Sequence, residues 1–388
     1  MSDQTNGHHN GQMRVLRISH SSLTPELRER ERMLVRRHPE VSLEVVTASR
    51  WHEGGLEVAA SDDDLFPVTK APTHLSKRLA LFAFDPRPII AALRRHRPHL
   101  IDISQESYML SCMESLTLSR WFAPGTKIVL AATQNILRRY PPPFEYFQRQ
   151  AFRTAAAAYA CSATVLEVLR AKGFHKPAPV IPFGVRLENF PPRPSGVSGD
   201  QPLTIGFIGR MVTAKGVFVL ADALAALAGE RWRALFVGDG PERGAFTQRL
   251  AAHGMLDRIE LTGAVNYAEV PKYFQRMDVM VLPTLTTPTF REQFGRVLVE
   301  AMASQVCVIG STCGSIPEVI GEAGLVVPEG DSASLAAGLR RLILDQDLRL
   351  RLSQRGRDRV EQHYTWEQVA DQMYELYLEA LKKTVRGA

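Results

Sequence analysis

Two glutamates, Glu292 and Glu300, bracket the stretch with the strongest chemical signal in this chain of 388 residues. Between them, Gly295 allows the backbone to approach a ligand closely and precedes an apolar helix start. Glu300 lies within Val-Leu-Val-Glu-Ala-Met-Ala, a run that otherwise reads as buried. A buried carboxylate is costly unless it is hydrogen-bonded, and the hydroxyl groups of a ribose or hexose would supply those bonds. The simpler alternative is a helix-dipole charge with a buried salt bridge.

A pair of basic residues precedes the glutamates in a pattern that suits a phosphate. Residues 203–210 read as a buried parallel strand, and Lys215-Gly216 leads into a helix over 217–227. Arg210 and Lys215 are therefore expected beside the carboxyl end of a strand and a helix N-terminus, where open α/β sheets bind phosphates. An arginine fork and a lysine point charge suit a diphosphate. Taken alone, the pair is equally well explained as basic residues in a loop.

Strand and helix patterns alternate along both halves of the chain. This alternation predicts an α/β protein with doubly wound parallel sheets. The length is sufficient for two cores of ordinary domain size. The strands are expected over residues 15–19, 42–47, 99–104, 127–132 and 157–161 in the first half, and over 203–210, 259–265, 279–284 and 306–310 in the second. Residues 234–240 are expected to be a further strand that ends in a glycine turn.

Four motifs follow one another in a recognisable order. They are Gly209-Arg210 with Lys215-Gly216, Val237-Gly-Asp-Gly-Pro241, Glu292-x7-Glu300, and Gly314-Ser-Ile-Pro-Glu318. In this order they resemble glycosyltransferase family 4, which comprises retaining, nucleotide-sugar-dependent enzymes of the GT-B fold. The resemblance covers residues 155–380 well and the N-terminal half more loosely. It implies two Rossmann-like domains, each doubly wound, facing a central cleft.

The resemblance also implies where a donor would bind. We expect a UDP- or GDP-sugar on the C-terminal domain, with Glu300 accepting hydrogen bonds from the ribose. Arg210 and Lys215 would hold the diphosphate, and Glu292 would hold the sugar hydroxyls. The expected catalytic residues are Arg210, Lys215 and Glu292, and the expected donor-binding residues are Gly209, Val265, Phe294, Gly295, Arg296, Val297 and Glu300. The expected enzyme is metal-independent and uses no cofactor besides its nucleotide-sugar co-substrate.

Polar residues at the strand ends of the N-terminal half are candidates for the acceptor site. They are His20, Glu106, Gln134 and Asn135. Turn and helix-cap chemistry is the alternative explanation. The chain departs from the family here, because many members have a histidine near the strand end that this chain continues with Thr-Gln-Asn. The expected acceptor is a sugar, a polyol, a lipid-linked molecule or another small molecule.

Composition divides the chain into five segments. Residues 1–12 are expected to be a disordered leader, and 13–185 an acceptor-side Rossmann-like domain. Residues 186–202, rich in Pro, Gly and Ser, are expected to be a linker. Residues 203–364 are expected to be the nucleotide-sugar-binding domain, and 365–388 a terminal helix that crosses back to the N-terminal domain. Arg186 stands where the family usually has an aspartate.

The positive charge is concentrated in the first half. Residues 1–185 hold 24 Lys and Arg against 17 Asp and Glu, whereas 186–388 hold 23 against 24. We expect a cytoplasmic protein. Solvated helix faces are the favoured explanation of the charged runs at residues 28–37 and 94–97. The alternative is peripheral membrane contact through the basic domain. Nucleic-acid binding is not favoured, because no nucleic-acid motif accompanies the basicity.

Two other patterns and one rival function remain. Asp62-Asp63-Asp64 has the Asp-x-Asp spelling of metal-bound nucleotide sugars in the other large glycosyltransferase fold, but a solvated acidic loop explains it better. The four cysteines form no Cys-x-x-Cys pattern, which indicates reduced structural thiols and no zinc site. The rival function is a GT-B-shaped nucleotide-sugar epimerase. It would share the sheets but not the glutamate pair beside Arg210 and Lys215.

Overall fold

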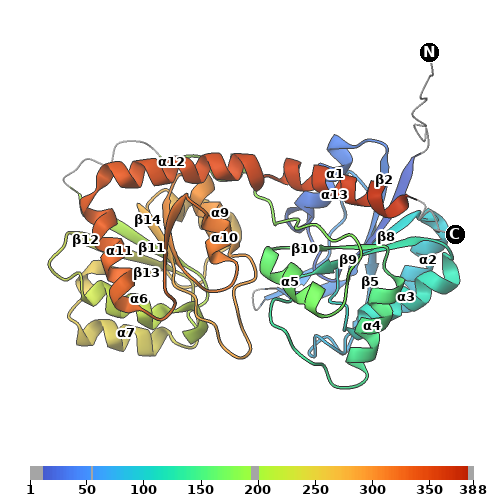
Figure 1. The fold of residues 1–388 in the computed structure, drawn as a ribbon, viewed down its shortest axis with the longest axis horizontal. Coiled ribbons are helices and arrows are strands. Elements are labelled where there is room, and N and C mark those ends of the chain that lie inside the picture. The colour runs from blue at the N-terminus through green and yellow to red at the C-terminus, as the bar shows by residue number, and fades with distance from the viewer. Residues whose placement is uncertain (1–11, 54–55, 194–200, 383–388) are drawn as a thin grey trace, which may run out of the picture.

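The computed structural model describes residues 12–53, 56–193 and 201–382, which form two α/β domains side by side (Figure 1). Each domain is built on a six-stranded sheet in which all the pairings are parallel. The expected leader, apart from Gln12, lies outside the described residues, as does 194–200 of the expected linker. Within that linker, the described part contains a short turn of 3-10 helix over Leu187–Asn189.

The N-terminal domain has strand order β10-β9-β8-β1-β2-β5. Its strands are β1 (Met13–Ile18), β2 (Val41–Ala48), β5 (Val68–Ala71), β8 (Leu100–Ile103), β9 (Lys127–Ala132) and β10 (Ala157–Ala160). Its helices are η1 (Pro25–Arg28), α1 (Glu29–Arg37), α2 (Pro86–His96), α3 (Leu110–Phe122), α4 (Phe144–Thr154) and α5 (Ala163–Ala171). Two small antiparallel pairs complete it: β3 (Arg50–Glu53) with β4 (Leu56–Ala59), and β6 (Thr73–His74) with β7 (Ala83–Phe84).

The C-terminal domain has strand order β13-β12-β11-β14-β15-β16. Its strands are β11 (Leu203–Ile208), β12 (Trp232–Val237), β13 (Ile259–Leu261), β14 (Val279–Leu282), β15 (Cys307–Ser311) and β16 (Gly324–Val327). Its α-helices are α6 (Val217–Ala225), α7 (Arg243–Ala252), α8 (Val270–Phe274), α9 (Arg296–Ala303), α10 (Ile316–Ile320), α11 (Ser332–Leu344) and α12 (Gln346–His363). Short 3-10 turns are η3 (Thr213–Lys215), η4 (Leu256–Arg258) and η5 (Tyr267–Glu269).

The two sheets share one winding order, so the predicted pair of Rossmann-like domains is confirmed. In each sheet the first strand lies in the middle and the chain reverses direction across the sheet beside it. The reversal falls between β1 and β8 in the N-terminal domain and between β11 and β14 in the C-terminal domain. Open α/β sheets bind ligands at the carboxyl ends of the strands at such a reversal. A ligand site is therefore expected in the loops that follow these four strands.

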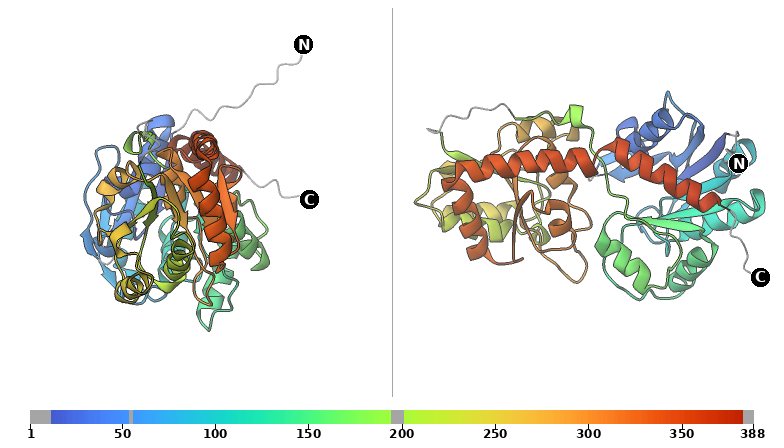
Figure 2. Two further views of the ribbon diagram at one scale, coloured as in Figure 1. Left: turned by 90° about the vertical axis from the view of Figure 1, so that its left-hand side faces the viewer. Right: turned by 45° about the horizontal axis from the view of Figure 1, so that its top comes forward.

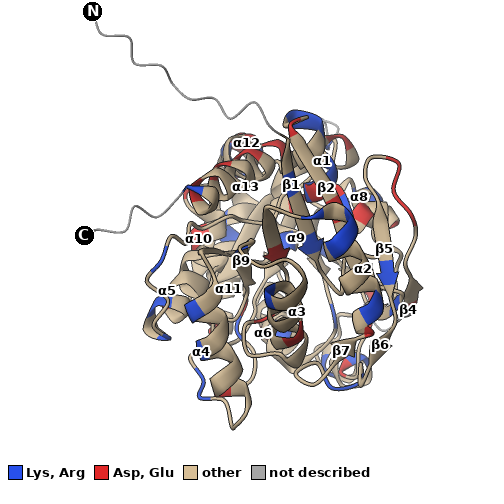
Figure 3. Cartoon of the chain, turned by 90° about the vertical axis from the view of Figure 1, so that its right-hand side faces the viewer, with Lys and Arg blue, Asp and Glu red and all other residues tan. Residues whose placement is uncertain are grey.

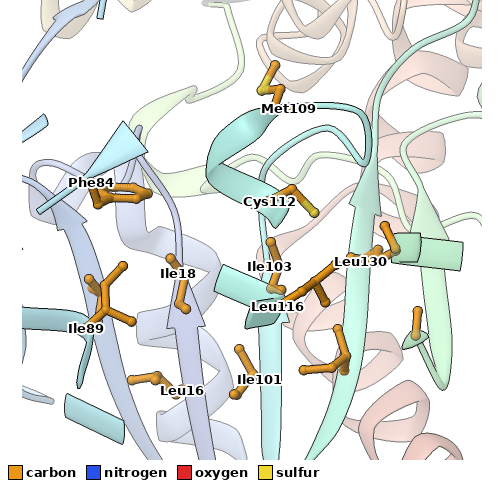
Figure 4. Packing of buried hydrophobic residues seen from close by; sticks show 14 of the residues in the cluster. Leu16, Ile18, Phe84, Ile89, Ile101, Ile103, Met109, Cys112, Leu116 and Leu130 are labelled. Atoms are coloured by element: carbon orange, nitrogen blue, oxygen red, sulfur yellow. The ribbon is translucent and has the colours of Figure 1, made fainter. Parts of the chain in front are cut away.

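Both faces of the N-terminal sheet are buried, which explains why its strands read as continuous apolar runs. Leu16 and Ile18 of β1 pack toward α2 and α3, with Ile101 and Ile103 of the neighbouring β8 (Figure 4). Val15, one position along β1, points to the opposite face and joins a second core cluster. That second cluster includes residues of the last helix, α13 (Trp366–Leu381).

The last two helices join the domains. Helix α12 packs on α9 and β15 of the C-terminal domain, and α13 packs on α1 and β9 of the N-terminal domain (Figures 1 and 2). Asp371 of α13 forms an ion pair with Arg37 of α1, at 2.7 Å. The Tyr377 hydroxyl donates to the buried Asp102 carboxylate of β8, at 2.7 Å. At the junction, Arg186 forms an ion pair with Glu29 of α1.

The expectation of solvated charges was wrong for η1, for the start of α1 and for Asp63 of the expected acidic loop. Arg28 is fully buried and donates to Asp63, and Arg32 contacts both Asp63 and Asp64. Lys70 forms an ion pair with Asp62. Acidic and basic residues are thus interleaved around α1, as Figure 3 shows for the domain as a whole. Within the part of the chain that the structure describes, no three His, Cys, Asp or Glu side chains gather as metal ligands.

Candidate active site

A pocket of about 270 Å³ opens at the carboxyl end of β11, at the reversal point of the C-terminal sheet. Seven of the residues expected from the sequence line it together. They are Gly209, Lys215, Glu292, Gly295, Arg296, Val297 and Glu300. Four further residues complete the lining: Ile208, Tyr267, Val270 and Leu282. The pocket thus combines one lysine, one arginine and two carboxylates with an apolar floor.

Glu300 lies on α9 and is only 4% exposed. Its Oε1 accepts a hydrogen bond from the Tyr267 hydroxyl at 2.8 Å and another from Arg296 Nε at 3.0 Å. Burial raises the pKa of this carboxyl group, while Arg296 and Tyr267 oppose the shift. Arg296 also lies over the Tyr267 ring, 4.8 Å from its centroid. The carboxylate is therefore held rigidly at the pocket wall by one of its two oxygens.

Glu292 and Lys215 form the second polar element of the pocket. Lys215 Nζ lies 2.6 Å from Glu292 Oε2, and the buried Thr284 hydroxyl donates to the same oxygen at 3.2 Å. The lysine also lies 5.0 Å from the centroid of the Phe290 ring. Glu292 is 8% exposed. Lys215 follows β11 and Glu292 follows β14, the two neighbouring strands at which the winding order reverses. The ion pair therefore spans the reversal point.

Gly295 explains how the chain turns from the Glu292 loop into α9. It is the N-cap residue of that helix, with φ 78° and ψ 49°, a left-handed conformation that residues with a side chain rarely adopt. The first N–H groups of an α-helix have no partner within the helix itself. The turn therefore brings the first turn of α9 to the pocket, which Gly295, Arg296 and Val297 line.

Three of the expected donor-site residues do not line the pocket. The Phe294 side chain is buried between the rings of Phe183 and Tyr364 at the domain junction. Val265 packs against the hydrophobic core beneath the pocket. Arg210 is exposed, two residues after the end of β11. The backbone of Phe294 adjoins the pocket, because the next residue, Gly295, lines it.

Tyr267 is the main residue that the sequence did not indicate. It lies in the turn η5 after β13, where aromatic side chains have no characteristic spacing. Its hydroxyl holds Glu300, and its ring lies beneath Arg296. Burial is the main cause that raises the pKa of this hydroxyl, with the negative charge of Glu300 the next, so it remains a donor at neutral pH. The sequence gives one indirect indication: a buried Glu300 carboxylate needs a hydrogen-bond donor, and Tyr267 supplies it.

His20 follows β1 in the N-terminal domain and is enclosed by aromatic rings. The Trp51 ring lies 4.7 Å away and the Phe82 ring 5.1 Å away, centroid to centroid. Burial lowers the pKa of His20 to about 4, so the imidazole is neutral at physiological pH. Its Nδ1 has no hydrogen-bond partner among the residues that the structure describes.

Glu106 and Gln134 lie at neighbouring strand ends, after β8 and β9. Glu106 Oε1 accepts from the backbone N–H of Thr133 at 2.8 Å and from its hydroxyl at 2.5 Å. Burial raises the pKa of the Glu106 carboxyl group. Gln134 Oε1 accepts from the backbone N–H of Ile136 at 3.0 Å. The turn chemistry that was the alternative explanation is therefore present at both residues, and their acceptor role stays a prediction.

Asn135 differs from the other three acceptor candidates, because it reaches the opposite domain. Its Nδ2 donates to the backbone carbonyl of Glu292 at 2.7 Å. The side chain is buried, with 2% exposed. Asn135 therefore lies between the two domains and bonds to the backbone of Glu292, the residue expected to bind the donor sugar.

A second pocket, of about 190 Å³, lies at the opposite end of the same sheet. Its three arginines already have partners: Arg276 pairs with Glu260, Arg233 donates to Thr204, and Arg258 donates to the carbonyl of Glu230. It lies where the strands begin, away from the reversal point. Its position and its paired charges make it a poor candidate for the donor site.

The two Rossmann-like domains meet at the ends of their strands, and one of them carries this pocket. This arrangement is that of the GT-B class of glycosyltransferase folds. Solved structures support the class. Sucrose-phosphate synthase from Thermosynechococcus elongatus aligns over 95% of this chain and 98% of its own, with a TM-score of 0.70 and 20% identity. HepE from Anabaena, solved in complex with UDP, aligns over 95% and 99%, with a TM-score of 0.71 and 18% identity. At these identities the likeness establishes the fold.

The family follows from the sequence of the C-terminal domain. Residues 202–345 match the family described as Glycosyl transferases group 1. Residues 202–345 thus carry a group 1 glycosyltransferase domain, which bears out the predicted resemblance to glycosyltransferase family 4. Among the helices that the structure describes, none is long and apolar enough to cross a membrane.

Curated relatives match over about half of the chain. The gpi3 subunit of phosphatidylinositol N-acetylglucosaminyltransferase from Schizosaccharomyces pombe is 32% identical over 213 residues, 54% of this chain and 45% of the relative. Phosphatidyl-myo-inositol mannosyltransferase from Mycobacterium leprae is 34% identical over 204 residues, 51% of this chain and 52% of the relative. The chain thus spans about half the length of the relatives that it matches.

Proposed function

We propose that the protein is a retaining glycosyltransferase that moves a sugar from a nucleotide-diphosphate donor to a hydroxyl-bearing acceptor. The observation that carries this proposal is the meeting of Glu300, Glu292 and Lys215 in one pocket at the reversal point of the C-terminal sheet. Each group suits one part of a nucleotide sugar. The carboxylates are acceptors for hydroxyl groups, and the lysine is a counter-charge for a phosphate.

In this proposal, Glu300 accepts hydrogen bonds from the ribose hydroxyls. Its Oε1 already accepts hydrogen bonds from Tyr267 and Arg296, so we assign Oε2 to the ribose hydroxyls. Lys215 and Arg210 hold the diphosphate and stabilise its charge as the glycosidic bond breaks. The backbone N–H groups at the start of α9 assist in holding the sugar.

Glu292 is assigned to the sugar hydroxyls and not to nucleophilic attack. Lys215 and Thr284 both bind its Oε2, which fixes the carboxylate and reduces its nucleophilicity. We therefore propose attack of the acceptor on the same face that the diphosphate leaves, assisted by the leaving phosphate. This route retains the anomeric configuration without a glycosyl-enzyme.

UDP is the preferred nucleotide in this proposal, with GDP the alternative. Support comes from the GT-B structures of Anabaena HepE, which were solved with UDP and with UDP-glucose. For the acceptor we propose a sugar, polyol or lipid-linked molecule. Relatives named for phosphatidylinositol, malate and 2-deoxystreptamine support a hydroxylated acceptor without selecting one. Independence from metals, a cytoplasmic location and membrane contact stay predictions.

A donor screen tests the proposal. The protein is incubated with UDP- and GDP-sugars, with and without a panel of hydroxylated acceptors, and nucleotide release is followed by chromatography. Release that increases with one acceptor, with the matching product mass, is the expected result. An epimerised nucleotide sugar without nucleotide release would favour the rival epimerase. No turnover of any donor, together with no UDP binding by calorimetry, would contradict the proposal.

A further inference from the structure

The backbone of Glu292 is fixed as firmly as its side chain. Glu292 belongs to the segment from Pro283 to Gly295, between β14 and α9, which we call the Glu292 loop. Its carboxylate is held within the C-terminal domain by Lys215 and Thr284. Its carbonyl oxygen, by contrast, lies at the boundary between the domains. What holds that carbonyl therefore influences where the carboxylate points.

The Glu292 carbonyl receives hydrogen bonds from both domains. Asn135 Nδ2, from the N-terminal domain, donates at 2.7 Å. The same amide also approaches the carbonyl of Arg291, at 3.4 Å. From the C-terminal domain, Ser315 donates through its backbone N–H at 3.2 Å and through its hydroxyl at 3.3 Å. The bond from Asn135 is the shortest of these.

Gly314 accounts for the close packing around this carbonyl. A Cβ atom at Gly314 would lie 2.0 Å from the Glu292 oxygen, and φ there is +60°. Only glycine allows so close an approach. The motif Gly314-Ser-Ile-Pro-Glu318 thus supplies the close approach and, through Ser315, two donors. Its role at the site is to hold the Glu292 carbonyl from the side opposite the N-terminal domain.

Two further contacts from the N-terminal domain reach the same loop. Arg138 donates to the carbonyl of Pro288 at 3.0 Å. Cys161 Sγ lies 3.8 Å from the carbonyl of Gln293. Both are bonds to backbone carbonyls, so they position the loop without depending on its side chains. Both bonds, like the bond from Asn135 to Glu292, would break if the two domains moved apart.

The end of the same motif joins the domains directly. The carboxylate of Glu318 accepts from the backbone N–H of Ala163 at 2.9 and 3.1 Å, at the start of α5. A carboxylate at a helix N-terminus is electrostatically favourable. The Glu292 loop and the motif that holds it are therefore both bonded to the N-terminal domain.

We propose that Asn135 is a positioning residue, which couples closure of the domains to the placement of Glu292 in the donor pocket. The inference rests on the proposed function. When the domains close, the Asn135 amide fixes the Glu292 carbonyl, and the carboxylate is held beside Lys215. Asn135 directly follows Gln134 and lies two residues from Thr133, which binds Glu106, so an acceptor bound there adjoins the coupling residue. The donor sugar is thus fully held only when the acceptor-bearing domain has closed.

The test compares Asn135→Ala and Asn135→Asp with the control Arg138→Ala. The control removes a bond from the same domain to the same loop, but at Pro288 and not at Glu292. For Asn135→Ala we expect kcat to fall about ten- to a hundredfold, the scale of losing a buried hydrogen bond. Asn135→Asp should be at least as damaging, because its carboxylate would face two carbonyl oxygens. Arg138→Ala should have a clearly smaller effect on kcat.

Two binding measurements separate positioning from a general structural role. UDP affinity by calorimetry should stay close to that of the wild type in Asn135→Ala, since the nucleotide lies on the other domain. Hydrogen exchange of the Glu292 loop should become faster in Asn135→Ala, and this readout requires no catalysis. It therefore judges the role of Asn135 even if the donor screen fails.

Two outcomes would overturn the inference. One is wild-type kcat and wild-type exchange of the loop in Asn135→Ala. The other is an equal loss of UDP affinity and kcat in that variant, which would indicate a structural role.

Discussion

Replacing Glu300 provides the sharpest test of the donor site. Glu300→Ala removes a buried carboxylate to which we assign the ribose hydroxyls, through the oxygen not used by Tyr267 and Arg296. Hydrogen bonds to a charged group contribute about 1.5–3 kcal/mol each. A net loss of about 3 kcal/mol would weaken UDP binding about a hundredfold, since 1.4 kcal/mol corresponds to a factor of ten. Glu300→Gln retains one carbonyl acceptor and should lose less.

The assay is titration calorimetry with UDP and with 2′-deoxy-UDP. The wild type should prefer UDP, because the missing hydroxyl leaves the carboxylate without one of its partners. Glu300→Ala should bind the two nucleotides about equally, since the group that distinguishes them is gone. Tyr267→Phe is the matched control, because it removes a bond to Glu300 but keeps the carboxylate. It should weaken UDP binding only a few-fold, on the scale of one hydrogen bond.

Two results would refute this reasoning. Unchanged UDP affinity in a folded Glu300→Ala protein would remove the ribose assignment. A preference for UDP that persists in Glu300→Ala would show that another group recognises the hydroxyl.

Three further predictions concern other parts of the molecule. Arg210→Ala and Lys215→Ala should each lower turnover by about two to three powers of ten in initial-rate assays, whereas EDTA should leave the wild type active; loss of activity in EDTA would indicate a required metal. Because burial lowers the pKa of His20 from 6.5 to about 4, the unfolded chain binds the proton first, and stability is lost as pH falls through this window. Denaturant curves should show that wild type loses about 2 kcal/mol more than His20→Gln between pH 7 and pH 5, and equal losses would contradict the assignment. Gln134→Ala should raise the KM for the acceptor with little change in UDP affinity. If acceptor binding and UDP binding weaken equally, Gln134 does not belong to the acceptor site.

Much of the candidate donor site could be predicted from the sequence, because its residues lie at the ends of strands with clear apolar patterns. Glu300 was recognised as a charge within a run of buried types, and the structure confirms that it is buried. Lys215 was placed at a helix start after β11, and it lines the pocket. These positions depend on local pattern and on the winding rule of α/β sheets, both of which can be read from one chain.

The remaining features depend on contacts between distant segments. Tyr267 reaches Glu300 across 33 residues, and Asn135 reaches Glu292 across 157. Nothing in the local sequence of either residue indicates its partner. Arg28 reads as part of a charged, solvated helix, yet it is fully buried because the chain returns at Asp63 to pair with it. Tertiary packing decided these features, and local pattern does not encode it.

The crossing of α12 into α13 has a consequence for the order in which the chain folds. The ribosome completes the N-terminal sheet early, but α13, which covers one of its faces, follows the whole C-terminal domain in the sequence. Until then, the apolar side chains around Val15 and the carboxylate of Asp102 lack the cover that Met373 and Tyr377 provide. The domain synthesised first is therefore the one completed last. A nonsense mutation before Trp366 would leave the C-terminal domain whole and expose the N-terminal one to chaperones and proteases.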